Sequence, residues 1–281
     1  MKYGIHLGVW SRLGKKPSEL INTAKNLGFD CVEVFLPPLD DQELQNIKKA
    51  LKDTGMSCIS GVALSEEHDV SAYDKKRRRN GILFLKKCIE KAASLESPLI
   101  TGITYSSWGT PPEEYDRKTL WLNSVRSLKE VCKYAKKFDI EIGVEAVNRF
   151  KSYLINTAED AIKFVKDVDE PNIKIHLDTF HMNIEEKDFY TPIVKTGNLL
   201  GYLHCIENDR GIPGTGHVDW NALFKALKEI RYDRWVVIET FPPGVKGLSE
   251  KVCAWRWVFP DEIELASKGL QFLQKMEKKV R

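Results

Sequence analysis

Four side chains that can bind a metal ion or transfer a proton each follow a short apolar run in the second half of the chain. They are Glu145, Asp178, His204 and Glu239, at intervals of roughly 30 residues, about the length of one strand-and-helix unit. The four residues therefore recur at the same phase of successive units. Three carboxylates and one imidazole suit one divalent ion such as Mn²⁺, Mg²⁺ or Co²⁺ better than a structural zinc site, which usually recruits thiolates.

Along the whole chain, short β-branched runs alternate with longer amphipathic stretches, which is the pattern of a parallel sheet flanked by helices. The runs predict strands near residues 3–9, 30–36, 56–62, 98–103, 140–145, 172–178, 200–206 and 234–240. The stretches predict helices near residues 17–27, 40–54, 73–95, 116–138, 157–168, 190–197, 219–230 and 261–278. If the strands close into a barrel, the four candidate ligands emerge at its carboxyl-terminal rim, where such barrels keep their active sites.

This alternation predicts a single α/β domain over residues 1–281, a (β/α)8 TIM barrel, because no linker rich in Pro, Gly or Ser divides the series. An open doubly wound sheet alternates similarly, but it normally carries a glycine-rich first turn. Here that turn, residues 10–14, reads WSRLG. Longer loops are predicted at residues 63–72, 104–115 and 241–260, and their aromatic residues would cover a substrate at the rim.

The composition favours a small-molecule substrate. The chain has 43 basic and 40 acidic residues, and a net charge of +3 is too slight to predict a nucleic-acid or membrane partner. The basic run at residues 75–79 opens a predicted helix and is interpreted as a solvated face. No basic start leads into an apolar segment after Met1, and no apolar run approaches the roughly 20 residues that span a bilayer. We therefore expect a cytoplasmic protein whose six cysteines are reduced, buried packing residues.

Three segments carry a resemblance to a known family. Residues 144–150 (VEAVNRF), 177–186 (LDTFHMNIEE) and 238–241 (IETF) resemble signatures of ketose 3-epimerases of the D-tagatose/D-allulose (psicose) type, which belong to the xylose-isomerase-like TIM barrels. The similarity extends to residues 4–6 (GIH), to Trp108 with its Pro-rich loop and to residues 213–216 (PGTG). It covers essentially the whole chain, and LDTFHMNIEE is its most specific part.

The resemblance implies an isomerase that inverts C3 of free ketoses such as D-tagatose, D-fructose, D-allulose or L-ribulose. One divalent ion, with Mn²⁺ favoured over Mg²⁺ and Co²⁺, would bind Glu145, Asp178, His204 and Glu239, hold the ketose through O2 and O3, and stabilise the enediolate as a Lewis acid. Glu145 and Glu239 would remove a proton from one face of C3 and return one to the other. The resemblance also implies a homodimer or homotetramer.

Four further positions transfer as substrate contacts. His181 stands three residues beyond Asp178, near enough to contact the same sugar. Arg210 follows the His204 strand and offers a fixed positive charge to hydroxyl groups. Trp108 and Phe241 would form an apolar wall beside the far end of the ketose.

Two positions depart from the family pattern. Lys151 stands where these epimerases usually carry a glutamate directly after the VNRF motif, and His6 replaces the usual aromatic residue of the first strand. Both are predicted to lie at the substrate site. They leave the preferred sugar open, and Lys151 makes a substrate with an acidic group worth testing.

Three other functions remain open. Aldose–ketose or hydroxypyruvate isomerases and keto-inositol dehydratases use similar metal barrels with paired carboxylates. An endonuclease of abasic DNA sites shares the Asp-Thr-x-His motif, but it needs extra histidines from earlier strands, and this chain has only six histidines in all. A non-catalytic sugar-binding protein would not need exchangeable acid and base groups, so proton exchange with D₂O separates it from the enzymes.

Overall fold

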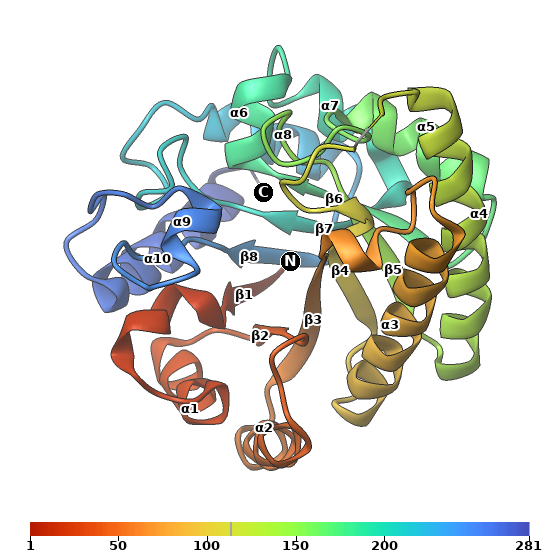
Figure 1. Cartoon of the computed structure of the whole chain (residues 1–281). Helices are drawn as coiled ribbons and strands as arrows, with labels where there is room; N and C mark the ends of the chain where they lie inside the picture. Colours follow the sequence, from red (N-terminus) through yellow and green to blue (C-terminus); the bar gives the residue numbers. More distant parts are fainter. Residues whose placement is uncertain (113, 281) are drawn as a thin grey trace.

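A computed structural model describes residues 1–112 and 114–280. In these residues eight parallel strands close into a barrel in sequence order, with β1 pairing to β8 (Figure 1). The predicted α/β barrel is therefore confirmed. The predicted domain 1–281 includes residues 113 and 281, and the predicted loop 104–115 includes residue 113, which lie outside the described residues. The strands are β1 (Lys2–His6), β2 (Cys31–Phe35), β3 (Ser57–Leu64), β4 (Leu99–Ser107), β5 (Glu141–Glu145), β6 (Ile173–Asp178), β7 (Leu200–His204) and β8 (Trp235–Ile238).

The helices lie around the outside of the barrel (Figure 1). The α-helices are α1 (Pro17–Leu27), α2 (Asp41–Thr54), α3 (Lys75–Ser94), α4 (Arg117–Ala135), α5 (Ala158–Val168), α6 (Thr179–Glu185), α7 (Thr191–Thr196), α8 (Trp220–Glu229), α9 (Ser249–Val252) and α10 (Glu262–Val280). Short 3₁₀ helices are η1 (Leu7–Leu13), η2 (Glu66–His68), η3 (Lys136–Phe138) and η4 (Gly197–Leu199). The large apolar core lies between the sheet and this outer layer.

Several helix ends are set by residues that the sequence marks. The Thr157 hydroxyl accepts a hydrogen bond from the Asp160 amide at 3.1 Å and caps α5, and Asp219 caps α8 in the same way. Gly28 and Gly55 end α1 and α2 with φ angles of 93° and 67°, a left-handed conformation that glycine adopts without steric cost. These residues therefore fix where α5 and α8 begin and where α1 and α2 end.

A separate cluster of buried residues fills the inside of the barrel. Its members come from β2, β3, β4, β7 and β8: Cys31, Ile59, Leu99, Tyr202, Trp235 and Val237. Successive residues of a strand face opposite sides of the sheet, so Tyr202 and His204 point to the same interior. The candidate site therefore lies directly above this packed cluster, at the rim of the barrel.

The structure corrects several predicted boundaries. The first strand, predicted at residues 3–9, ends at His6, because the His6 ring accepts a hydrogen bond from the Gly8 amide and starts η1. The fourth strand, predicted at residues 98–103, continues to Ser107. Helix α6 was not predicted and begins directly after Asp178, whose side chain caps it. The predicted loop at residues 241–260 contains α9.

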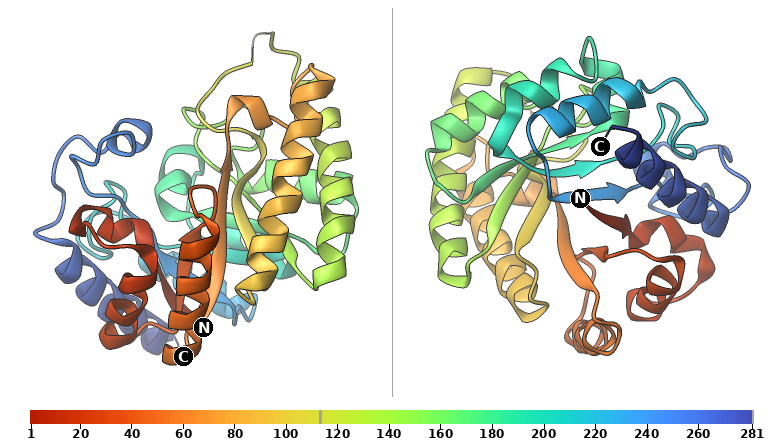
Figure 2. Two further views of the ribbon diagram at one scale, coloured as in Figure 1. Left: turned by 60° about the horizontal axis from the view of Figure 1, so that its bottom comes forward. Right: turned by 180° about the vertical axis from the view of Figure 1, so that it is seen from behind.

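Both ends of the described chain lie side by side where the strands begin (Figure 2). The Met1 amine lies 3.2 Å from a carboxylate oxygen of Glu277. The basic run at residues 75–79 opens α3 as expected, and two of its arginines, Arg77 and Arg79, form exposed ion pairs with Glu66 and Glu130. Within the described residues, no helix is both long and apolar enough to cross a membrane.

All six cysteines are free thiols. Five of them are buried, as predicted from the apolar segments around them. The prediction is wrong for Cys253, which is exposed, because it follows the short helix α9 in a rim loop instead of lying in a packed element.

Candidate active site

The barrel register brings the four predicted ligands together. Glu145, Asp178 and His204 are the last residues of β5, β6 and β7, and Glu239 directly follows β8. Asp178 pairs with His204 across neighbouring strands, and His204 pairs with Val237 of β8. Because all these strands are parallel, their final side chains meet at the same rim.

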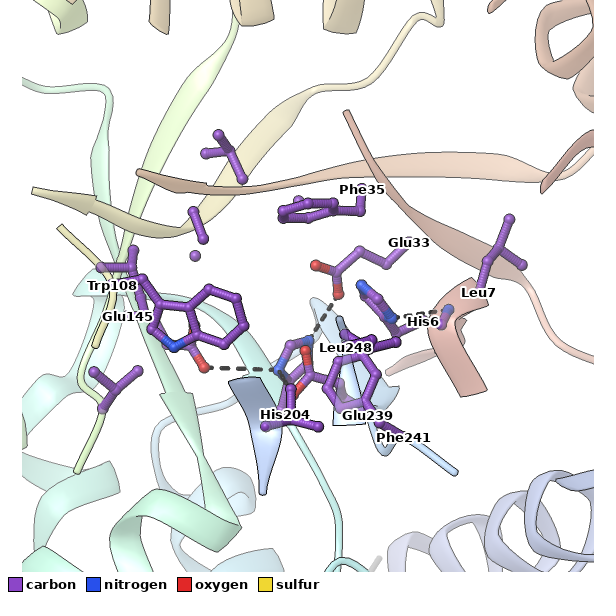
Figure 3. Close-up of a pocket in the computed structure, with 18 of the residues that line it drawn as sticks. His6, Leu7, Glu33, Phe35, Trp108, Glu145, His204, Glu239, Phe241 and Leu248 are labelled. Carbon is purple, nitrogen blue, oxygen red and sulfur yellow. Dashed lines mark hydrogen bonds and ion pairs between the residues drawn. The ribbon is translucent and has the colours of Figure 1, made fainter. Parts of the chain in front are cut away.

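Three carboxylates surround one imidazole nitrogen. The Nδ1 atom of His204 lies 3.8 Å from an oxygen of each of Glu145, Asp178 and Glu239. Figure 3 shows Glu145 and Glu239 directed toward the His204 ring. Because bonds from a small divalent cation to its ligands are about 2 Å long, two ligands of one ion lie no more than about 4 Å apart. The spacing therefore fits one cation.

Two buried atoms support the same interpretation. Neither His204 Nδ1 nor Asp178 Oδ2 has a hydrogen-bond partner among the described residues. The other oxygen of Asp178 accepts a hydrogen bond from the Phe180 amide at 2.7 Å. Buried polar atoms are rarely left without a partner, and two of them that converge with carboxylates form a set of donors for a metal ion.

The site holds more negative charge than its own residues balance. Burial, together with the nearby carboxylates of Glu239 and Asp178, raises the pKa of Glu145 well above its usual value, although His204 opposes the shift. Burial disfavours the charged form of His204, but Glu239 and Glu33 outweigh it and raise the pKa of His204. Both groups therefore hold protons more firmly than usual, and a bound cation would compete with those protons.

Glu33, which the sequence analysis missed, holds His204 from the other side. Its Oε2 atom lies 2.7 Å from His204 Nε2 and accepts a hydrogen bond from the Tyr202 hydroxyl at 2.8 Å. Burial would raise the pKa of Glu33, but His204, through charge and hydrogen bonding, lowers it to about 2. A carboxylate that accepts the Nε2 proton leaves Nδ1 free to bind a cation.

His176 is a second residue that the sequence analysis did not assign to the site. It is fully buried on β6, its Nδ1 atom lies 3.0 Å from the Thr101 hydroxyl, and the same atom lies 3.9 Å from Glu145. Its ring packs edge-on against that of His204, with centroids 4.2 Å apart. His176 therefore packs against His204 and lies close to Glu145, on the side of the site that faces the barrel interior. The signal was a histidine two residues before Asp178 on the same strand, a spacing that places both on one face.

His181 lies on the first turns of α6, beside the four ligands. Its Nδ1 atom accepts a hydrogen bond from the Asn148 amide at 3.2 Å, and its Nε2 atom lies 4.0 Å from Asp178. Burial lowers the pKa of His181 to about 4, which keeps the ring neutral. With Nδ1 acting as an acceptor, Nε2 carries the proton and faces the site.

Arg210 also reaches the site. Its guanidinium donates to Glu239 at 2.9 Å, and it stacks over Phe180 at 4.3 Å and near Phe241 at 5.6 Å from the ring centres. The residue has a φ of 66°, a left-handed conformation that non-glycine residues rarely adopt. Its fixed charge therefore lies beside a proposed proton carrier.

The predicted site residues share one cavity of about 630 Å³ at the rim, except for Asp178, which is fully buried behind it. Trp108 and Phe241 line this cavity from the loops after β4 and β8, and Phe241 packs edge-on against His6 at 5.4 Å. In Figure 3, Trp108 and Glu145 lie on one side of the cavity and His6 on the other. These residues form the walls in which a small polar molecule would face the carboxylates.

Lys151 lines the cavity, but its ammonium points toward a rim loop. Its Nζ atom donates to the backbone carbonyl of Lys251 and lies 3.6 Å from the sulfur of Cys253. It also lies 6.0 Å from the centre of the Trp108 ring. Lys151 therefore links the loop after β5 to the loop that contains α9, across the mouth of the cavity.

The fold is a parallel (β/α)8 barrel whose rim carries a carboxylate cluster that could hold a metal ion, and comparisons with known proteins identify its family. The model of the xylose isomerase-like TIM barrel family matches residues 21–276. D-psicose 3-epimerase of Ruminiclostridium cellulolyticum is 35% identical over 264 residues, covering 91% of this chain and 89% of the relative. L-ribulose 3-epimerase of Mesorhizobium japonicum is 34% identical over 278 residues, covering 97% and 93%.

A solved structure gives the same result. D-psicose 3-epimerase with D-tagatose from Clostridium cellulolyticum H10 has a TM-score of 0.92 and 32% identity, covering 99% of each chain. The chain belongs to the ketose 3-epimerases of the xylose isomerase-like TIM barrel family, a family of sugar-epimerising isomerases. The predicted family and enzyme class are confirmed.

Proposed function

We propose that this chain inverts C3 of free ketoses by moving protons between C3 and the carboxylates of Glu145 and Glu239. The observation that carries the proposal is the convergence of Glu145, Asp178 and Glu239 on His204 Nδ1, each at 3.8 Å. A purely sugar-binding protein has no need for several buried carboxylates with excess negative charge. This charge supports an enzyme that uses a cation.

Glu145, Asp178, His204 and Glu239 would hold one divalent cation. Oxygen and imidazole donors together favour Mn²⁺, with Mg²⁺ and Co²⁺ as alternatives. When bound, the cation supplies positive charge that stabilises the negative charge developing on the ketose oxygens during deprotonation.

The two glutamates provide the proton carriers. The hydrogen at C3 is acidified by the neighbouring carbonyl at C2. One carboxylate takes this proton, the C3–H electron pair delocalises toward the carbonyl oxygen, and the other group returns a proton to the opposite face of C3. Glu145 ends β5 and Glu239 follows β8, so the two carboxylates reach the site from different strands.

The remaining predicted residues would position the sugar. His181 Nε2 and the Arg210 guanidinium are donors for hydroxyl groups, and Trp108, Phe241 and His6 supply walls that exclude water. The contact of Lys151 with the Lys251 carbonyl supports a role in closing the cavity. A substrate with an acidic group stays a candidate, because Lys151 would have to release that contact to bind it.

The named relatives act on five- and six-carbon ketoses, which supports the same substrate class here. We further propose that residues 1–281 work as one catalytic domain and that the protein forms a homodimer or homotetramer. A cytoplasmic location stays a prediction.

The test is solvent exchange with the Mn²⁺-loaded protein. D-tagatose, D-fructose, D-allulose and L-ribulose are incubated separately in D₂O, and C3 deuterium and epimer formation are followed by NMR. At least one sugar is expected to show both deuterium at C3 and formation of its epimer. Conversion to an aldose would indicate an isomerase instead, and no exchange across the panel would refute the assignment. A keto-inositol is incubated in parallel, and its loss of water would indicate a dehydratase.

A further inference from the structure

The cavity is larger than a free ketose requires. A hexulose has twelve heavy atoms, and even if each took the ~30 Å³ of a liquid water molecule, the sugar would fill at most about 360 Å³. The cavity volume is about 630 Å³, a size typical of pockets for larger ligands. Room for a further chemical group therefore remains beside the sugar.

The additional room lies away from the metal ligands. The ligands come from β5 to β8, but the cavity continues along a wall from the first part of the barrel, which we term the β1–β3 annex. In Figure 3, Leu7 belongs to this wall and lies on the side of the cavity opposite Glu145 and Trp108. The annex is lined by Leu7, Ser11, Leu20, Phe35, Leu39 and Ala63, from η1, α1, β2, the loop after β2, and β3.

The annex is mostly apolar, and the polar residues that line the cavity from η1 and the turn after it are Ser11 and Lys15. Leu20 and Leu39 are buried, whereas the Phe35 side chain at the end of β2 is 36% exposed, a large apolar surface left open beside the cavity. The hydroxyl oxygen of Ser11 is buried and has no hydrogen-bond partner among the described residues. Such a wall suits a hydrocarbon group joined to the sugar through an ether or ester oxygen.

We propose that the annex binds an apolar substituent on the ketose, so that a ketose substituted at a terminal carbon is preferred over the free sugar. The inference rests on the proposed C3 chemistry and extends its substrate class. The substituent packs against the exposed Phe35 side chain and the neighbouring apolar residues of the annex. The carbonyl and C3 stay at the carboxylates, so the proton transfers are unchanged.

The test compares D-fructose, 6-O-benzyl-D-fructose, 1-O-benzyl-D-fructose and D-fructose 6-phosphate. With the Mn²⁺-loaded protein, one benzyl ether is expected to have a kcat/KM for C3 exchange at least about tenfold higher than that of D-fructose, because burying a ring of this size is worth well over 1.4 kcal/mol. Equal or lower values for both ethers overturn the inference, as does a gain with the phosphate alone.

Substitutions in the annex test whether it causes the preference for a benzyl ether. Ser11→Phe fills the annex and Phe35→Ala removes its exposed wall, and each is expected to lower the ratio of kcat/KM between benzyl ether and D-fructose at least about fivefold. Ser11→Ala is the matched control, because it removes the hydroxyl without filling space and should keep most of the preference. A ratio that none of the variants changes places the substituent elsewhere and overturns the inference. Thermal melting confirms that each variant folds.

Calorimetry separates this inference from the proposed function. The dissociation constant of each sugar is measured with the loaded protein, whether or not exchange occurs. No C3 exchange with any sugar, but at least tenfold tighter binding of a benzyl ether, refutes the epimerase proposal and supports the annex. Exchange with all sugars at equal affinity supports the epimerase and overturns the annex.

Discussion

His204 and Glu33 lie 171 residues apart in the chain, yet their side chains are joined by a contact of 2.7 Å between Nε2 and Oε2. The contact crosses the barrel interior, from β7 to β2, and fixes which nitrogen of His204 faces the carboxylates. A histidine held in this way presents its other nitrogen to a cation without having to reorient.

Glu33→Gln should weaken Mn²⁺ binding about 10- to 100-fold, because the neutral amide holds the Nε2 proton of His204 less firmly. Isothermal titration calorimetry on the metal-free protein measures the dissociation constant directly. Glu43→Gln is the matched control: Glu43 is also buried, but it accepts its hydrogen bond from the Ser18 amide at the start of α1. Equal affinities in the two variants would show that Glu33 does not orient the site.

Glu145→Gln and Glu239→Gln should each lower C3 exchange about 10²- to 10⁴-fold, since an amide cannot transfer the proton. Each variant also changes a predicted ligand, so Mn²⁺ occupancy is measured by electron paramagnetic resonance and rates are compared at saturating metal. Near-normal exchange by a loaded variant would remove that glutamate from the proton path.

Metal removal should destabilise the protein, because carboxylates that crowd one buried site repel one another without a cation. At a metal concentration 100 times the dissociation constant, binding stabilises by about 2.7 kcal/mol, which corresponds to a rise in Tm of about 5–10 °C relative to the EDTA-treated protein. Differential scanning calorimetry measures the difference. An unchanged Tm in Mn²⁺, Mg²⁺ and Co²⁺ would argue against a cation site.

The gain in Tm should shrink as the pH falls. The pKa values of Glu145 and His204 are both raised in the metal-free protein, Glu145 mainly by burial and His204 by Glu239 and Glu33. Both groups therefore hold protons more firmly than usual, and a cation must displace them, so lower pH weakens binding. Melting curves at pH 5.5 and pH 7.5 test this, and a larger gain at the lower pH would contradict it.

Lys151→Ala should loosen the rim loop that contains α9. The variant loses the hydrogen bond from Nζ to the Lys251 carbonyl, so amide hydrogen exchange at residues 248–253 should become about three- to tenfold faster. Lys246→Ala is the control, because Lys246 is exposed in the same loop. Similar exchange in both variants would show that Lys151 does not restrain the loop.

The barrel and the four convergent residues were predictable from the sequence because they follow from a simple geometric rule. In a parallel barrel, every strand end reaches the same rim, so the phase of Glu145 or Asp178 in its own unit is enough to place it. The same rule could not find Glu33, which lies in the middle of its strand. The available signal was a single acid inside the apolar run CVEVF, since a buried charge requires a partner.

Other features depend on contacts between distant parts of the chain, which periodicity does not report. The family pattern marked Lys151 as a reversed charge beside the substrate, but its partner, the Lys251 carbonyl, lies 100 residues later. Helix α6 was missed because Asp178 was assigned only to the site. Its second role, as the cap of α6, starts a helix in a stretch where the sequence analysis predicted neither a helix nor a strand.

This double use of Asp178 has an evolutionary consequence. One oxygen holds the first turn of α6 and the other faces the cluster. A substitution by asparagine would keep a capping oxygen and lose the charge, and one by alanine would lose both. Selection for folding and selection for chemistry therefore act on the same side chain, so this position can drift only if both constraints are relaxed together. In the annex, Leu20 and Leu39 also belong to the buried core, whereas Phe35 is exposed and lies outside that core, so changes of substrate within the family are expected to arise at Phe35 first.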